Sequence, residues 1–149
     1  ILRLKYILKR YIDHPVYNYE NYTIYDPETG NKSLIFTREV NHLGSKALRI
    51  IDFVGDINVL GKLSEWLKFI VLNNNYEYVD LLCNGIEKTL LGKSGLINTK
   101  DNFDIVPTYF EPFIKQNIDI HFEKSHKELI LFKGESDGDR PNISKRIVS

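Results

Sequence analysis

Residues 50–56 are a mostly apolar run in which a predicted strand ends on glycine, at Gly55. An amphipathic segment, residues 61–72, follows closely. Apolar side chains in the second segment recur every three or four residues, which predicts a helix with one wide apolar face. A strand that enters a helix through a glycine-containing turn leaves backbone N–H groups at the helix start. Such groups commonly cradle phosphate or pyrophosphate. We therefore expect the functional site at this junction.

The strand at this junction is one of four expected strands, three before the helix and one after it. Residues 17–25, 33–40 and 47–54 have strand character and are separated by turns rich in Gly, Asn and Asp, which predicts an antiparallel meander. Residues 76–83, after the helix, form a nearly unbroken apolar strand. This order of strand, helix and strand is typical of a parallel pair buried on both faces.

The remaining segments complete a single domain. Residues 1–12 have helical spacing, residues 86–91 can form a second short helix, and residues 104–113 carry two prolines and should be extended or irregular. Residues 128–133 are expected to be the last strand, followed by a polar loop over residues 134–142. The predicted fold class is therefore α/β (α+β), with a mixed sheet covered by helices in one domain of 149 residues.

Composition limits the classes of partner. The chain has 20 basic and 20 acidic side chains, so no overall field would draw it to nucleic acid or to an anionic membrane. Its single cysteine, Cys83, cannot form an internal disulfide, which favours a reducing, cytoplasmic setting. No apolar run is long enough for a membrane span. The chain contains no Met, and we expect it to be the later part of a longer protein.

The order of these elements resembles the later two thirds of the fold of the GNAT family of N-acyltransferases, without its N-terminal part. Residues 50–72 resemble the acyl-CoA region of that family, and residues 76–83 resemble the strand that splays away from it. The tail, residues 133–142, together with residues 109–113, is similar to GNAT-like proteins associated with bacterial surface-polysaccharide synthesis.

The resemblance implies acetyl-CoA or another acyl-CoA as the donor. Backbone groups of residues 52–55 would pair with its pantetheine arm, and N–H groups of residues 58–62 would hold its pyrophosphate. The expected cofactor-binding residues are Phe53, Val54, Gly55, Asn58, Gly61 and Lys62. The chain departs from the family pattern at Asp56, which lies between the widely spaced glycines, and at Leu91, where the family often has a catalytic Tyr.

Two polar residues at strand ends are candidates for catalysis. Asp56 could act as a base or orient an acceptor amine, and the alternative is that it caps the following helix. Asn84 could hydrogen-bond the donor arm, and the alternative is a plain turn residue. Cys83 is expected to be a core residue because its neighbours are apolar.

The polar loop near the end of the chain is a candidate acceptor site. Arg140 could grip a carboxylate or phosphate of a sugar nucleotide, and Asp139 could bind a hydroxyl or amine. The expected substrate-binding residues are Asp137, Asp139, Arg140 and Asn142. The alternative is a surface turn with an Asp–Arg pair. No metal site is expected, because the loop lacks the remaining oxygen ligands of a calcium loop and the four histidines are scattered.

The resemblance implies transfer of an acyl group from acyl-CoA to an amine of a small polar acceptor such as an amino sugar. The amine would attack directly, with backbone N–H groups polarising the carbonyl. Two alternatives remain open at this point: a non-catalytic binding module, and an aminoacyl transferase that uses a carrier-bound donor. A homodimer is possible under each of them.

Overall fold

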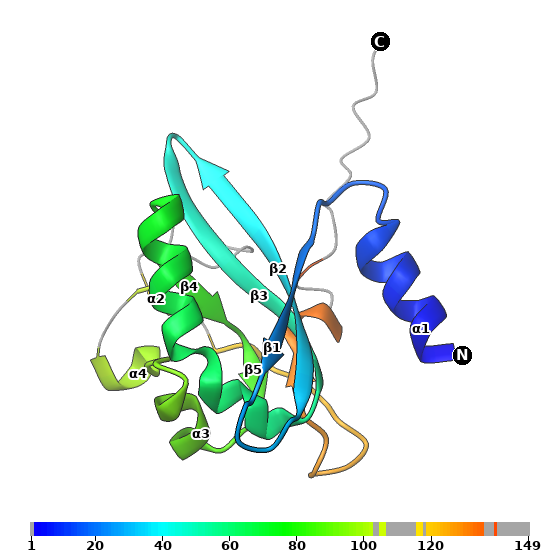
Figure 1. Cartoon of the computed structure of the whole chain (residues 1–149). Helices are drawn as coiled ribbons and strands as arrows, with labels where there is room; N and C mark the ends of the chain where they lie inside the picture. Colours follow the sequence, from blue (N-terminus) through cyan, green and yellow to red (C-terminus); the bar gives the residue numbers. More distant parts are fainter. Residues whose placement is uncertain (1, 103–104, 107–115, 118, 136–138, 140–149) are drawn as a thin grey trace.

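A computed structural model of the chain describes residues 2–102, 105–106, 116–117, 119–135 and 139 (Figure 1). The strands are β1 (Glu20–Tyr25), β2 (Lys32–His42), β3 (Ser45–Gly55), β4 (Tyr78–Leu81), β5 (Cys83–Asn84) and β6 (Leu131–Phe132). The α-helices are α1 (Leu2–Ile7), α2 (Leu63–Asn74), α3 (Lys88–Lys93) and α4 (Thr99–Asn102). A π-helical turn, η1 (Leu8–Ile12), continues α1, and two 3₁₀ segments are η2 (Ile57–Lys62) and η3 (Lys133–Glu135).

The main sheet has the strand order β1-β2-β3-β4. β1, β2 and β3 are antiparallel neighbours, whereas β4 is parallel to β3 and is reached through α2. The predicted mixed sheet, with its antiparallel meander and crossover helix, is thus confirmed. The β2–β3 hairpin turns through Leu43 and Gly44, which both have positive φ, as a tight hairpin turn matched to the strand twist requires.

The parallel pair in the sheet is short. β3 and β4 are in register from Ala47 opposite Tyr78 to Ile50 opposite Leu81, and there the pairing ends. On the other edge of β3 the register with β2 shifts at the same place, so that Ile51 is an extra residue in β3. A bulge bends a strand and increases its twist. β3 therefore turns away from β4 after Ile50, and no strand among the described residues pairs with that edge of residues 51–55.

Helices cover the two faces of the sheet, and each face has buried core residues under its helix. α2 lies on one face and α1 with η1 on the other (Figure 1). The face under α2 holds the larger core; its buried residues are Ile24, Ile35, Ile50, Phe53, Val59, Leu60, Leu63, Leu67 and Phe132. On the opposite face Tyr11 stacks on Phe36, with ring centroids 4.2 Å apart, and both pack with Ile51. The bulged residue thus anchors the N-terminal helix.

Some element boundaries differ from the sequence-based expectation. The predicted helix over residues 61–72 is α2, Leu63–Asn74, and the 3₁₀ segment η2, which Asp56 caps, precedes it. The predicted strand over residues 76–83 divides into β4 and β5, because β4 loses its partner where β3 bends away and β5 pairs with β6 instead. Most of the expected extended segment, residues 104–113, lies outside the described residues.

Gly55 should be needed at the end of β3 for two reasons. Its φ is +139°, and a Cβ there would lie 2.4 Å from Ser33 Oγ and 2.9 Å from the carbonyl oxygen of Lys32. We expect Gly55→Ala to lower the free energy of unfolding by roughly 2–4 kcal/mol, measured by denaturant titration. The matched control is Gly44→Ala, where φ is +90° and no atom lies within 4 Å. Its loss should be about 1–2 kcal/mol. Equal losses would show that close packing at Gly55 is unimportant.

Candidate functional site

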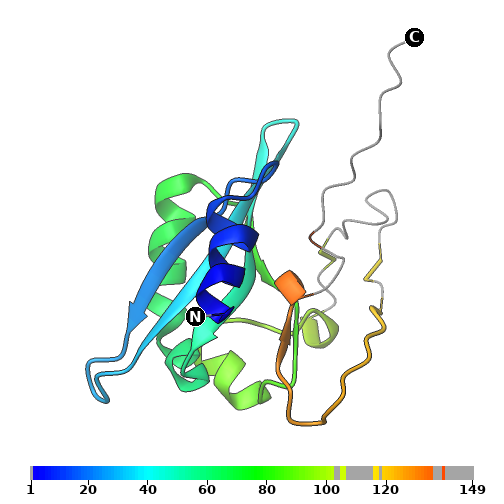
Figure 2. The same cartoon turned by 90° about the vertical axis from the view of Figure 1, so that its right-hand side faces the viewer.

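A cavity with a volume of about 370 Å³ lies at the end of β3, beside the edge that has parted from β4. It is lined by Tyr6, Ile7, Asp52, Phe53, Val54, Gly55, Ile57, Ile130, Phe132 and Glu135. These residues come from α1, β3, the start of η2 and the segment that contains β6 and η3. Figure 2 shows α1 (blue) and the β6–η3 segment (orange) near the end of β3. The site is thus assembled from both ends of the described chain.

One wall of the cavity combines main-chain groups with apolar side chains. Phe53 is 5% exposed, and its ring centroid lies 6.2 Å from that of Phe132. Phe53, Val54 and Gly55 were expected from the sequence to contact a cofactor, and the structure brings all three to this wall. The wall therefore combines the last residues of β3 with an apolar surface.

The buried carboxylate in the cavity lining is that of Asp52. Its Oδ2 accepts a hydrogen bond of 2.6 Å from the Tyr11 hydroxyl, and its Oδ1 accepts one of 2.7 Å from the backbone N–H of Phe53. Burial and the neighbouring carboxylate raise the pKa of Tyr11, so this phenol remains a proton donor at neutral pH. The sequence argument had placed the candidate carboxylate four residues later, at Asp56.

Asp56 is the N-cap of η2, as the alternative interpretation of the sequence had it. Its Oδ1 accepts hydrogen bonds from the backbone N–H of Asn58 at 3.0 Å and from the Asn58 side-chain amide at 2.9 Å. The backbone N–H of Val59 donates to the Asp56 carbonyl oxygen at 3.1 Å. In this arrangement a carboxylate takes the helix-start position in which the resemblance implied a pyrophosphate.

Gly61 and Lys62 lie apart from the cavity lining. A Cβ on Gly61 would lie 3.1 Å from Leu90 Cδ1, so the glycine allows η2 to pack closely on α3. The Lys62 ammonium lies 3.0 Å from Glu28 Oε1 and 3.5 Å from Asp26 Oδ1. Its hydrogen bond to Glu28 raises its pKa. Both residues thus have structural partners.

Asn84 and Cys83 form β5, and neither lines the cavity. The Asn84 side-chain oxygen accepts a hydrogen bond of 3.0 Å from Lys124 Nζ. Burial raises the pKa of Cys83 to about 11, which makes a thiolate scarce at neutral pH. The described contacts of both residues are therefore those of a connecting strand.

Asp139 belongs to a buried cluster of ion pairs and hydrogen bonds. It is 1% exposed, and its Oδ1 accepts hydrogen bonds from Arg38 Nε at 3.1 Å and Arg38 Nη2 at 2.5 Å. Its Oδ2 accepts a hydrogen bond of 2.5 Å from Tyr19, and Arg10 lies 3.9 Å away. This enclosure differs from the expected open lip. The other predicted residues of that loop, Asp137, Arg140 and Asn142, lie outside the described residues.

A row of buried charged side chains crosses the face of the sheet on which Arg38 binds Asp139. The sequence argument missed this row. Arg38 on β2 is in register with Arg49 on β3, which is in register with Asp80 on β4. Arg49 Nε lies 3.3 Å from Asp80 Oδ2. Burial raises the pKa of Asp80, whereas burial and then Arg49 lower the pKa of Lys133 to about 8. The signal in the sequence was a charged residue inside each of three expected strands.

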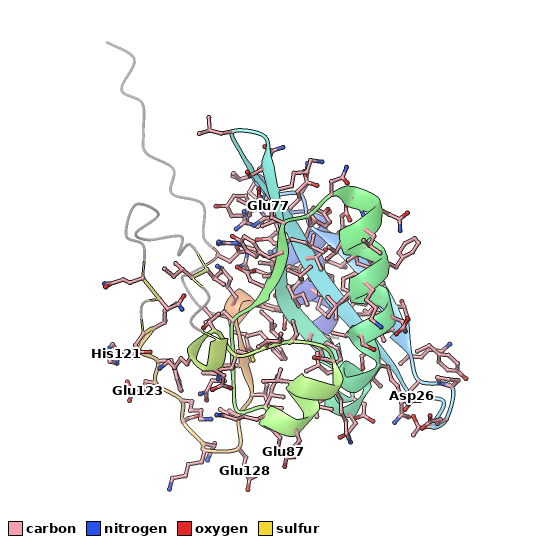
Figure 3. The ribbon with its side chains drawn as sticks, turned by 90° about the vertical axis from the view of Figure 1, so that its left-hand side faces the viewer. Asp26, Glu77, Glu87, His121, Glu123 and Glu128 are labelled. Carbon is pink, nitrogen blue, oxygen red and sulfur yellow. The ribbon has the colours of Figure 1, made fainter. Side chains whose placement is uncertain are left out.

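The described residues contain no group of three or more His, Cys, Asp or Glu side chains that could hold a metal ion. Figure 3 labels several of these side chains, and they lie spread around the rim of the molecule; they are Asp26, Glu77, Glu87, His121, Glu123 and Glu128. Within the same described portion, no helix combines the length and apolar character needed to cross a membrane.

The fold and the site define a mixed α+β domain in which a cavity with polar and apolar lining residues lies beside the parallel pair at one edge of the sheet. The chain matches no known protein-family model, no curated protein sequence and no solved structure. Its function must therefore be argued from the cavity and the residues around it.

Lys133 should leave a signature in the pH dependence of stability. Its pKa is about 8 when folded and 10.5 ordinarily, so the unfolded chain binds more protons between these pH values. Stability from this group therefore rises as pH increases from 8 to 10.5 and is lowest below pH 8. Relative to Lys133→Met, the wild-type protein should gain up to about 3 kcal/mol over this window.

The measurement is denaturant unfolding of both proteins across that window. The difference between them cancels tyrosine ionisation, which both share. A constant difference would contradict the depressed pKa of Lys133.

Proposed function

We propose that the chain is an N-acyltransferase that moves an acyl group from a pantetheine thioester to an amine of a small polar acceptor such as an amino sugar. The observation that carries this proposal is the cavity along the unpaired edge of residues 52–55. The resemblance to the GNAT family supports the same assignment, because that family is expected to place its acyl donor at such an opening.

The donor arm is matched to the wall of the cavity. Pantetheine is an extended chain with two amide groups, so it can lie along residues 53–55 and hydrogen-bond main-chain groups other than the Phe53 N–H, which donates to Asp52. Phe53 and Phe132 offer apolar contact beside that edge. The volume of about 370 Å³ lies within the usual range of small-molecule sites, roughly 300–1,000 Å³.

Asp52 and Tyr6 supply the polar groups that the reaction needs. The acceptor nitrogen attacks the thioester carbonyl carbon, the C–S bond breaks, and the amine proton passes to the Asp52 carboxylate. Among the described residues that line the cavity, Tyr6 has the sole phenol, and its proton goes to the departing thiolate. Asp52 then releases the amine proton to solvent, and the Tyr6 phenolate takes one up, so that both groups return to their starting state. Tyr11 holds Asp52 in place through the 2.6 Å hydrogen bond.

A carrier-bound donor is a second candidate, favoured by the start of η2. The Asp56 carboxylate occupies the N–H groups there, and Lys62 is paired with acidic residues of the β1–β2 turn. A negative charge at that point disfavours the pyrophosphate of CoA. A donor whose pantetheine arm is attached to a carrier protein needs no pyrophosphate site.

Isothermal titration of acetyl-CoA and acetyl-pantetheine tests the donor site. We expect binding in the micromolar range, and Ile130→Trp, which fills the cavity, should weaken it at least tenfold. The control is Leu129→Trp, since Leu129 is 42% exposed and lies outside the lining. Equal affinity for both ligands would favour the carrier-bound donor, and stronger binding of acetyl-CoA would favour CoA. If neither acetyl-CoA nor acetyl-pantetheine binds, the non-catalytic binding module becomes the favoured alternative.

Asp52→Asn tests the chemical step. The amide keeps the shape of the side chain but cannot take up the amine proton, so turnover with an amine acceptor should fall by about 10²-fold or more while donor affinity stays near that of wild type. Turnover is measured by release of free thiol. Unchanged turnover in this variant would remove Asp52 from the mechanism.

A further inference from the structure

The carboxylate of Asp139 is held by donors that come from a distant part of the chain. Arg38, on β2, directs both Nε and Nη2 to Oδ1 at 3.1 and 2.5 Å. Tyr19, just before β1, donates to Oδ2 at 2.5 Å. Arg10, on η1, lies 3.9 Å from Oδ2 and donates to the Asp139 backbone carbonyl at 3.3 Å. Guanidinium and phenol donors in this arrangement are typical of recognition sites for carboxylate and phosphate.

The two arginines also lie against aromatic rings. The Arg38 guanidinium lies 4.1 Å from the centroid of the Tyr17 ring. The Arg10 guanidinium lies 5.5 Å from the Tyr11 ring and 5.8 Å from the Tyr19 ring. Such stacking limits the rotamers of both arginines. The donor set is thus preorganised, as a ligand site requires.

Positive charge exceeds negative charge among the groups that contact one another here. Two guanidinium groups share the single carboxylate of Asp139. His14 lies beside Tyr17 and Tyr19. Burial and the positive charges of Arg10 and Arg38 lower the pKa of His14, and the negative charge of Asp139 offsets only part of this lowering. The two guanidinium groups therefore favour an anion at this place.

We infer that Arg10, Tyr19 and Arg38 form a binding site for an oxyanion of carboxylate or phosphate type, which Asp139 fills in this structure as an intramolecular stand-in. The site adjoins the cavity, because the Tyr11 ring contacts Tyr19 with centroids 5.2 Å apart and its hydroxyl binds Asp52. An acidic small molecule could place its anionic group between the arginines, with the buried Tyr11 ring between that group and the cavity. The inference does not require acyl transfer.

Anion rescue of Asp139→Ala tests this site. Truncation leaves two buried guanidinium groups without their carboxylate, so the thermal midpoint should fall by about 10 °C in sodium chloride. Sodium acetate or phosphate at matched ionic strength should raise it again in a saturable manner, by about 3 °C or more. A larger response to acetate identifies a carboxylate site, and a larger response to phosphate identifies a phosphate site.

Three further proteins separate specific binding from general salt effects. Wild type should not distinguish acetate from chloride, and the double variant Asp139→Ala with Arg38→Gln should lose the rescue. Asp119→Ala removes an exposed carboxylate, 2.6 Å from Lys100, and should show neither a large loss nor a rescue.

The inference fails if Asp139→Ala responds to acetate and phosphate as it does to chloride, or if the double variant is rescued equally. If Asp139→Ala does not fold in chloride, Asp139→Ser is used in the same three salts. Folding of either variant in acetate or phosphate alone supports the site. Failure of both variants to fold in every salt contradicts it, because a refilled anion site would restore the lost charge pair.

Discussion

The short parallel pairing between β3 and β4 is the constraint on which the rest of the site depends. It ends at Ile50 and Leu81, and the bulge at Ile51 bends β3 at the same position. Had the pairing continued, β4 would cover the edge of residues 51–55 and no cavity could open there. The bulge also turns Ile51 toward Tyr11 and Phe36, so that the same local irregularity opens one edge of the sheet and anchors a helix on its face.

The segment that ends the described chain completes what the bulge begins. A Cβ on Gly134 would lie 2.4 Å from the Tyr11 hydroxyl and 3.1 Å from the Ile51 carbonyl oxygen, so only glycine fits between the N-terminal helix and the bulge. Glu135, the next residue, lines the cavity, and Asp139 lies among the arginines on the other side of Tyr11. The core under α2 is formed by apolar side chains, whereas the opposite face combines an apolar cluster around Tyr11 with the ion pairs of Asp139.

The end of β3 and the start of η2 differ in what they leave available. Phe53, Val54 and Gly55, which the resemblance implied would contact the pantetheine arm, line the cavity. The helix start expected to hold the pyrophosphate is capped by Asp56. A carboxylate and a pyrophosphate compete for the same N–H groups, so the proposed donor is described by its pantetheine arm rather than by its nucleotide.

The meander, the crossover helix and the apolar strand after it follow from local periodicity and turn residues, so they could be predicted from the sequence alone. The capping role of Asp56 was one of the alternatives that the sequence left open. The side chains that meet could be found only in the folded chain: Asp52 with Tyr11, and Asp139 with Arg38, 101 positions away in the chain. Partners so distant leave no periodic signal, since strand pairing and the bulge set their distance. Local physics therefore predicts the elements, and long-range packing selects the site.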